Sequence, residues 1–280
     1  IVVSISQFFI GFTNIVNGFS SGLGKNGILS RIQAIGSLIA LPTCWLLLRG
    51  QTFVGMILAI IAVSISSAIP AYYFYKKSFF KIRLPSWPPD WRKFKKLTPY
   101  TLMLLVSAFA FPVTEMWIRQ SLIESSGYQQ AGLWQGSIKI SSAYIGFFGT
   151  FLSFYFMPRL SSTADKLVIA RLTFKMAAIL MTTFSIGATL FYLYRDQLIL
   201  IALSSKFSDL GNVIIYQLAG DFFKIGAYVI GFVAVAKAAV RLYIIAEIFQ
   251  NAIFIALSYV LTNGSLSLSG IMREYVYTYA

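Results

Sequence analysis

The chain consists of long apolar segments separated by short polar ones. A bilayer core about 30 Å thick requires around 20 helical residues, each rising about 1.5 Å. Eight segments of suitable length are bounded by charged residues, Pro or Gly, and a ninth begins near residue 268. The eight have approximate ranges 1–20, 28–48, 52–75, 98–119, 132–157, 173–194, 211–236 and 240–262. They are too long for transmembrane strands and do not alternate apolar and polar residues, so they predict an all-α, polytopic transmembrane helical bundle.

The composition also predicts a chain surrounded by lipid. Of its 280 residues, 58% are hydrophobic and 11% are charged, and the mean hydropathy is +0.74. Soluble domains have about 25% charged residues, so a water-soluble globule is excluded. The chain has no histidine, and its single cysteine, Cys44, lies in an apolar segment. We therefore expect no zinc site, no Ser-His-Asp triad, no disulfide framework and no cofactor.

The net charge of +14 is concentrated in alternate loops. The loops after the first, third, fifth and seventh segments hold 16 of the 23 Lys and Arg residues, whereas the intervening loops hold only Arg49, Arg195 and Lys206. The positive-inside rule places the cation-rich loops in the cytoplasm, which explains the charge without a nucleic-acid partner. The chain starts at Ile1 and ends just after an apolar segment has begun, so we expect an internal fragment of a longer protein.

The loop at residues 76–97 differs from the others. It combines eight cations with three Pro and two Trp residues. This composition suits an amphipathic linker against an anionic inner leaflet, and it also suits an ordinary positive-inside loop with interfacial tryptophans. We expect a hinge here, between about three helices in residues 1–75 and about five helices, with the start of a sixth, in residues 98–280.

Charged side chains inside the segments are few, and such groups usually face a cavity or a partner. Glu115 and Arg119 are four residues apart and can pair, although Arg119 is also close enough to the segment's outer end to reach the interface. In the next segment, Gln135, Lys139 and Ser142 form one polar stripe. Lys139 is the strongest single candidate, and its structural alternative is neutralisation by a carboxylate of a neighbouring helix.

The seventh segment places Gln217, Asp221 and Lys224 on one helix face. The spacing of Asp221 and Lys224 allows an ion pair. Glu247, in the eighth segment, is either matched by Lys139 or Lys224 from another helix or titrates alone. Interior cations and carboxylates balance, so they predict a polar cavity between helices without selecting the sign of a substrate.

Two stretches resemble a known family. They run from Ala131-Gly-Leu-Trp-Gln-Gly136 to Met157-Pro-Arg-Leu-Ser161, and from Leu203-Ser-Ser-Lys-Phe207 through Gln217-Leu-Ala-Gly-Asp221 to Ala236-Lys-Ala238. Both resemble Wzx-type polysaccharide flippases, most closely the lipid III flippases of the enterobacterial common antigen pathway. These belong to the multidrug/oligosaccharidyl-lipid/polysaccharide exporter superfamily. The resemblance is weaker before residue 97.

The resemblance implies a two-lobed, MATE-like fold of twelve helices, of which this fragment runs from about the fourth into the twelfth. It implies a transporter, not an enzyme, in the bacterial inner membrane. Such a flippase moves an undecaprenyl-diphosphate-linked oligosaccharide, lipid III or an O-antigen unit, to the periplasmic leaflet by alternating access. The implied setting is polysaccharide biosynthesis, of lipopolysaccharide or enterobacterial common antigen, with membrane lipids, a polymerase and a chain-length regulator as partners.

Seven residues are candidates for this function. Arg119, Gln135, Lys139, Asp221 and Lys224 are expected to bind substrate, and Glu115 and Glu247 to serve coupling. One alternative is a cation-coupled multidrug or small-molecule antiporter of the same superfamily that uses Asp221 or Glu247. Another is a membrane scaffold that transports nothing.

Overall fold

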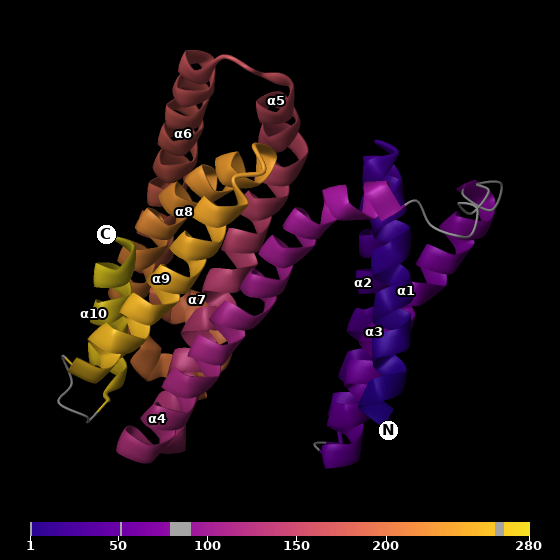
Figure 1. The fold of residues 1–280 in the computed structure, drawn as a ribbon. Helices are drawn as coiled ribbons and strands as arrows, with labels where there is room; N and C mark the ends of the chain where they lie inside the picture. The colour runs from indigo at the N-terminus through magenta and orange to yellow at the C-terminus, as the bar shows by residue number, and fades with distance from the viewer. Residues whose placement is uncertain (1, 51, 79–90, 261–265) are drawn as a thin grey trace. The chain divides into compact units, whose positions relative to one another are not determined.

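The computed structural model describes residues 2–50, 52–78, 91–260 and 266–280, and these are almost entirely helical (Figure 1). The all-α expectation is confirmed. The chain divides into two compact units, Ile1–Pro89 and Asp90–Ala280. Their boundary falls inside the predicted linker at residues 76–97, but residues 79–90 lie outside the described part. The hinge role of this linker stays a prediction.

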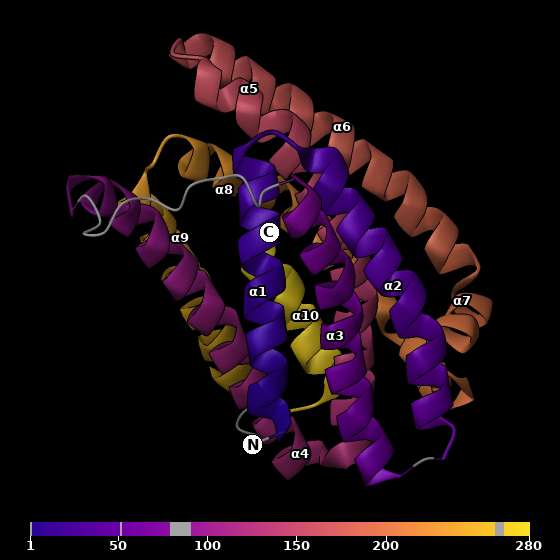
Figure 2. The same cartoon turned by 90° about the vertical axis from the view of Figure 1, so that its right-hand side faces the viewer.

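The first unit contains three helices, α1 (Val2–Gly22), α2 (Asn26–Leu48) and α3 (Phe53–Ser78). α3 packs along both α1 and α2 (Figures 1 and 2). Small residues permit this approach, because a Cβ added to Gly36 of α2 would lie 3.0 Å from the Ser67 Cα of α3. Close packing through small residues is typical of helices associating in lipid, where apolar burial provides little driving force.

The second unit has more elements, which follow one another as α4 (Trp91–Phe151), a π-helical turn η1 (Leu152–Phe156), α5 (Met157–Ser162), α6 (Lys166–Leu193), α7 (Arg195–Ala202), a 3-10 segment η2 (Ser205–Asn212), α8 (Ile214–Ala236), α9 (Val240–Val260) and α10 (Leu268–Tyr279). α8 is its central helix and packs against α4, α5, α6, α9 and α10 (Figure 1). Ile214, Ile225 and Val229 of α8 are completely buried in the unit's apolar core. The side chains of α8 are therefore held in place by helices on several sides.

α4 consists of two arms that fold back on each other at Gly127. This residue has φ +81° and ψ 172°, a conformation that is essentially restricted to glycine. The reversal is evident from a hydrogen bond in which Gln135 Nε2 donates to Glu115 Oε1 at 2.8 Å. In a straight helix, twenty residues would separate these side chains by about 30 Å. We call residues 91–126 the first arm and residues 128–151 the second arm.

The predicted spans have the right positions but end too early. Residues 120–131 and 158–172 were expected to be loops, whereas the first arm continues to Gly127, α5 continues to Ser162 and α6 begins at Lys166. The polar residues in these intervals therefore do not mark the ends of the helices. Six segments have the length and composition to cross a membrane, namely Gly27–Leu48, Phe53–Ser78, Leu97–Ser162, Lys166–Leu193, Ile214–Ala236 and Val240–Val260. The segment Leu97–Ser162 includes both arms of α4.

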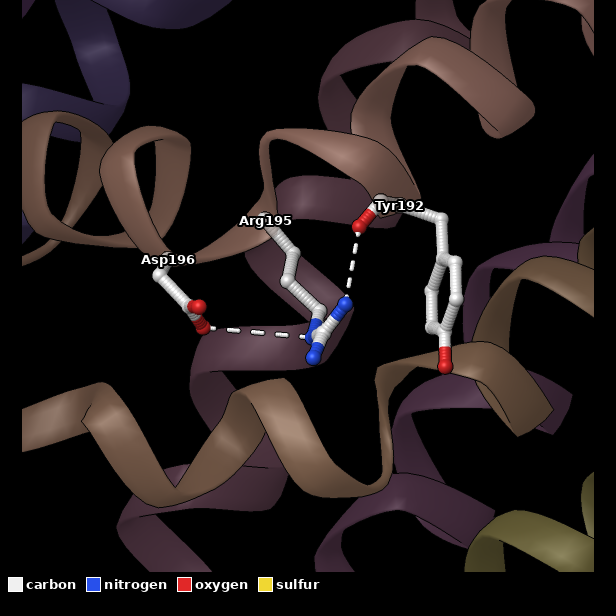
Figure 3. Close-up of polar contacts among 3 residues, drawn as sticks. All are labelled: Tyr192, Arg195 and Asp196. Atoms are coloured by element: carbon white, nitrogen blue, oxygen red, sulfur yellow. Dashed lines mark hydrogen bonds and ion pairs between the residues drawn. The ribbon is translucent and has the colours of Figure 1, made fainter.

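Side chains satisfy the backbone groups at both ends of α6. Asp165 Oδ1 accepts a hydrogen bond from Leu167 N at 2.8 Å and caps the first turn. At the other end, Arg195 Nη1 donates to Tyr192 O at 3.2 Å, and Arg195 Nε lies 3.9 Å from Asp196 Oδ1 (Figure 3). The guanidinium carbon also lies 4.7 Å from the centroid of the Tyr192 ring. Arg195, one of the few cations in the cation-poor loops, thus stabilises the corner between α6 and α7.

The C-terminal end of α8 is tied to α5. Lys237 Nζ donates to Leu160 O at 2.6 Å and also to Thr163 O. Carbonyls in the last turn of a helix lack partners within that helix, so a lysine from a neighbouring element stabilises them. The bond fixes α8 to α5 on the side of the membrane that the positive-inside rule assigns to the cytoplasm.

We expect Gly127→Ala to destabilise the second unit by about 1–3 kcal/mol, because alanine is strained at this φ and ψ. The measurement is the apparent melting temperature of the full-length protein in detergent. Gly132→Ala is the matched control, since a Cβ at this helical position of the second arm meets no atom within 4 Å. Equal melting temperatures for the two variants would contradict a strained reversal at Gly127.

Candidate functional site

A carboxylate lies at the centre of the second unit. The Asp221 side chain of α8 has no exposed surface. Its Oδ2 accepts hydrogen bonds from Tyr144 of the second arm and, at 3.1 Å, from Gln217 Nε2. Its Oδ1 accepts one from the Tyr275 hydroxyl of α10 at 2.6 Å. A buried carboxylate is costly unless its oxygens have donors, and here three elements of the unit supply them.

The network extends one step further along the second arm. Ser137 Oγ has one proton, which it shares between Trp134 O at 2.7 Å and Gln217 Oε1 at 3.4 Å. Gln217 is therefore held at both ends of its amide, and Ser137 and Gln217 are both buried. A continuous set of hydrogen bonds thus joins the second arm to α8 and α10.

Gly220 explains how Tyr275 reaches the carboxylate. A Cβ added to Gly220 would overlap the Tyr275 ring at Cδ1 and Cε1. The ring lies directly on the backbone of α8, one residue before Asp221, and its hydroxyl extends to Oδ1. Glycine allows helices to approach this closely.

Lys224 does not form the predicted ion pair with Asp221. Its Nζ lies over three aromatic rings, 5.2 Å from the centroid of Phe111, 5.4 Å from that of Tyr275 and 5.2 Å from that of Tyr279. No carboxylate lies within ion-pair distance of Lys224 in the described part of the chain. Tyr275 lies between the two charged residues, because its hydroxyl binds Asp221 while its ring faces Lys224. The spacing that allows this pair takes account of α8 alone.

Lys224 faces a second group of polar residues from neighbouring helices. The half-buried Glu247 of α9 lies near enough to Lys224 for their charges to interact, but the two do not form an ion pair. The match between Glu247 and a cation of another helix therefore stays a prediction. The hydroxyls of Tyr228 and Tyr279 lie within the electrostatic reach of the same carboxylate. Further along α9, the Tyr243 hydroxyl lies 2.7 Å from Ser107 Oγ of the first arm. The site thus has a buried part around Asp221 and a more accessible part around Lys224 and Glu247.

The four candidates on α4 lie apart from this cluster. Glu115 accepts its hydrogen bond from Gln135 and does not pair with Arg119, although their spacing allows it. Arg119 and Lys139 are exposed on the surface of the unit. Neither cation has an ion-pair partner among the residues that the structure describes. Neutralisation of Lys139 by a neighbouring carboxylate is therefore not observed.

Sequence reasoning missed the aromatic residues that complete the site. Tyr275 and Tyr279 are four residues apart and so share a face of α10, a signal that the short ninth segment concealed. Phe111 gave no signal, and Tyr144 was noted only within the family-like stretch from Ala131 to Ser161, because only the fold brings both residues to α8. Glu274 was also missed, and its side chain is 2% exposed with Oε2 unpartnered among the described residues. No group of three or more His, Cys, Asp or Glu suited to a metal ion occurs in the described ranges.

Comparison with known proteins identifies the family. No family model matches the chain. The lipid III flippase of Escherichia coli (strain K12) is 30% identical to it over 286 residues, which cover 99% of this chain and 67% of the relative. The lipid III flippase of Shigella flexneri gives the same values. The chain belongs to the lipid III flippase family. It is a multi-pass membrane protein of a transporter family, and not an enzyme.

Solved structures confirm the fold. An outward-facing MATE multidrug transporter of the MOP superfamily matches this flippase-family chain with a TM-score of 0.72 and 14% identity. A MATE transporter in complex with MaD5 gives a TM-score of 0.74 and 15% identity. Each match covers 99% of this chain and 64% of the solved chain. The chain thus has a MATE-like fold and spans about two thirds of the length of these proteins.

We expect Gly220→Ala to lower the stability of the second unit by about 1–3 kcal/mol, because the added methyl displaces the Tyr275 ring and overpacks the helix contact. The measurement is thermal unfolding of the full-length flippase in detergent. Gly231→Ala on the same helix is the control, because a Cβ there meets nothing within 4 Å.

Tyr275→Phe keeps the ring and removes only the donor to Asp221, so it should lower the free energy of unfolding by about 1–3 kcal/mol because one carboxylate oxygen is left unsatisfied. If all three variants melt like the parent, the Asp221 network contributes nothing to stability.

Proposed function

We propose that the protein to which this chain belongs moves an undecaprenyl-diphosphate-linked oligosaccharide across the bacterial inner membrane. The substrate passes from the cytoplasmic to the periplasmic leaflet by alternating access between two lobes. The family membership supports this proposal, and so does a single local observation, the state of Lys224. The main barrier to flipping is the transfer of a diphosphate and sugars through hydrocarbon, so a cation inside a membrane span is the group required.

Lys224 is prepared to bind an anion. Its ammonium group is held against three aromatic faces, which stabilise a cation by up to about 2 kcal/mol where it is desolvated. Ring faces leave the charge in place, whereas a direct carboxylate partner would neutralise it. The side chain is half-buried, so a ligand can reach it. A diphosphate would meet a positive charge with three N–H donors.

The other candidates take different roles in this proposal. Asp221 is a positioning residue, because it holds Tyr275 against Lys224 and is itself fully covered. Arg119 and Lys139 are exposed cations that meet the diphosphate or lipid head groups during its passage. Gln135 supports Glu115 through their hydrogen bond. Glu115 and Glu247 serve the coupling of transport to an ion gradient.

The pathway is the finer part of the proposal. The names of the two relatives favour lipid III, and hence enterobacterial common antigen, over an O-antigen unit of lipopolysaccharide. A polymerase and a chain-length regulator of that pathway would then receive the flipped product.

We expect Lys224→Gln in the full-length protein to reduce the flipping of lipid-linked oligosaccharide in proteoliposomes at least about tenfold, the effect of losing a charge-assisted contact worth about 1.5–3 kcal/mol. Lys206→Gln is the control, because Lys206 is an exposed residue of η2 outside the site. Complementation of a strain that lacks its lipid III flippase provides the second measurement. Normal surface glycan with Lys224→Gln would contradict the proposal. Loss of drug resistance on removal of the Asp221 or Glu247 carboxylate, with glycan export retained, would favour the antiporter.

We expect Glu247→Gln to strengthen the binding of undecaprenyl diphosphate by up to about fivefold, because it removes a charge that competes for Lys224. The same variant should make transport independent of the imposed pH gradient. Binding is measured calorimetrically in nanodiscs, and transport in proteoliposomes with and without the gradient. Glu124→Gln is the control, since Glu124 is exposed and bound to Gln120 of its own helix. Unchanged binding with intact gradient dependence would exclude Glu247 from coupling.

A further inference from the structure

The second unit contains a cavity at the end opposite Lys237. It has a volume of about 540 Å³ and is bordered by the reversal of α4, by η2 and by the start of α10. Its polar lining consists of Ser126, Gln130, Asp209, Asn212, Ser267 and Ser269. Leu133, Val213 and Leu268 complete the lining. The cation-poor loops place this end on the periplasmic side. We call it the outer cavity.

The lining of the outer cavity excludes several classes of ligand. It contains neither Lys nor Arg, so it offers no charge to a phosphate or a carboxylate. Among the described residues that line it, Asp209 is the one carboxylate, and hard divalent cations usually require more acidic oxygen ligands than one. Most of the polar groups that line the outer cavity are hydroxyls and amides, which both donate and accept hydrogen bonds. Such a lining matches a neutral molecule that carries many hydroxyl groups.

The polar residues that line the outer cavity differ in whether their side chains already form hydrogen bonds within the protein. Ser126 Oγ donates to Leu266 O at 2.5 Å, and Ser267 Oγ accepts from Gly270 N at 3.2 Å, so these two hold the rim in shape. Gln130, Asp209 and Asn212 have no side-chain hydrogen bond to the described part of the chain. Asp209 and Asn212 are exposed and Gln130 is half-buried, so all three lining side chains are accessible to a ligand. The volume falls within the usual range for small-molecule sites, about 300–1,000 Å³.

The outer cavity is aligned with the candidate functional site. Val213 and Lys224 are eleven residues apart, about three helical turns, and therefore lie on one side of α8. The same spacing relates Leu133 to Tyr144 in the second arm, and Leu268 to Tyr279 in α10. The cavity is thus displaced by about 16 Å along these helices from the Lys224 level. The buried pair Ser137 and Gln217 lies between the two levels.

We propose that the outer cavity is a binding subsite for an uncharged sugar residue. The inference rests on the proposed function, in which the flipped substrate carries an oligosaccharide toward the periplasm. Gln130 and Asn212 bind sugar hydroxyl or acetamido groups through their amides, and Asp209 accepts from a pair of hydroxyls. The three apolar residues contact the C–H face of the sugar ring. The subsite selects neutral sugars over acidic ones because it contains a carboxylate and no cation.

The experiment measures the binding of soluble sugars to the full-length protein in nanodiscs by saturation-transfer NMR and calorimetry. The probes are N-acetylglucosamine, glucose and glucuronate. We expect saturable binding of the two neutral sugars and weaker binding of glucuronate. Gln130→Ala and Asn212→Ala should each weaken neutral-sugar binding about fivefold, as expected for one lost hydrogen bond. Gln120→Ala is the matched control, because Gln120 is an exposed glutamine of the first arm outside the cavity.

Absence of saturable sugar binding, equal binding of glucuronate, or identical affinities in both cavity variants and the parent would each overturn the subsite. Calcium binding that is lost in Asp209→Asn, with no sugar binding, would overturn it in favour of a cation site. The flipping assay separates this proposal from the proposed function. Lost flipping in Lys224→Gln with unaltered sugar binding in both cavity variants refutes only the subsite. Weakened sugar binding in the cavity variants with normal flipping in Lys224→Gln supports the subsite and refutes the assigned role of Lys224.

Discussion

The burial of the Asp221 carboxylate is the constraint on which the second unit depends. A carboxylate without any exposed surface is stable only while donors occupy its oxygens, and here they come from α8, α10 and the second arm of α4. These three elements are far apart in the sequence, so the carboxylate specifies their register as well as their proximity. If any one of them slid by a helical turn, an acceptor would lose its partner in a low-dielectric interior, where such losses are most costly.

Tyr275 contacts both the buried Asp221 carboxylate and the Lys224 cation. One tyrosine uses its hydroxyl for the anion and its ring face for the cation, and thereby keeps Asp221 and Lys224 from neutralising each other. A direct pair would have been a simpler way to place two charges in a membrane span, but it would have left no net charge for a ligand. The separation depends on Gly220, since only the absence of a side chain there lets the ring lie against α8. Lys224 thus contacts three aromatic rings and forms no ion pair within the described part of the chain.

The sequence was sufficient for the helical class and for the positions of the membrane segments, because hydropathy reports directly on the bilayer, whereas the orientation taken from the Lys and Arg distribution stays a prediction. It located the ends of those segments poorly, since residues 120–131 are mostly polar and yet helical except at Gly127. It also found Asp221, Lys224 and Glu247, because charges in apolar helices are conspicuous. The two pairs that spacing along one helix allows, Glu115 with Arg119 and Asp221 with Lys224, do not form, however. Spacing along one helix cannot anticipate Gln135, Tyr144 or Tyr275, which arrive from other elements and compete for the same oxygen atoms.

The bond from Lys237 to the end of α5 bears on how the unit can move. α8 is held at this end by two carbonyl oxygens and at mid-length by the carboxylate network. Tilting or sliding α8 alone would break both sets of bonds together, whereas displacing the whole unit would break neither. Rigid-body rocking is the motion by which many transporters expose a site to alternate sides of the membrane. The bonds of α8 therefore favour movement of the second unit as one body over movement of α8 within it.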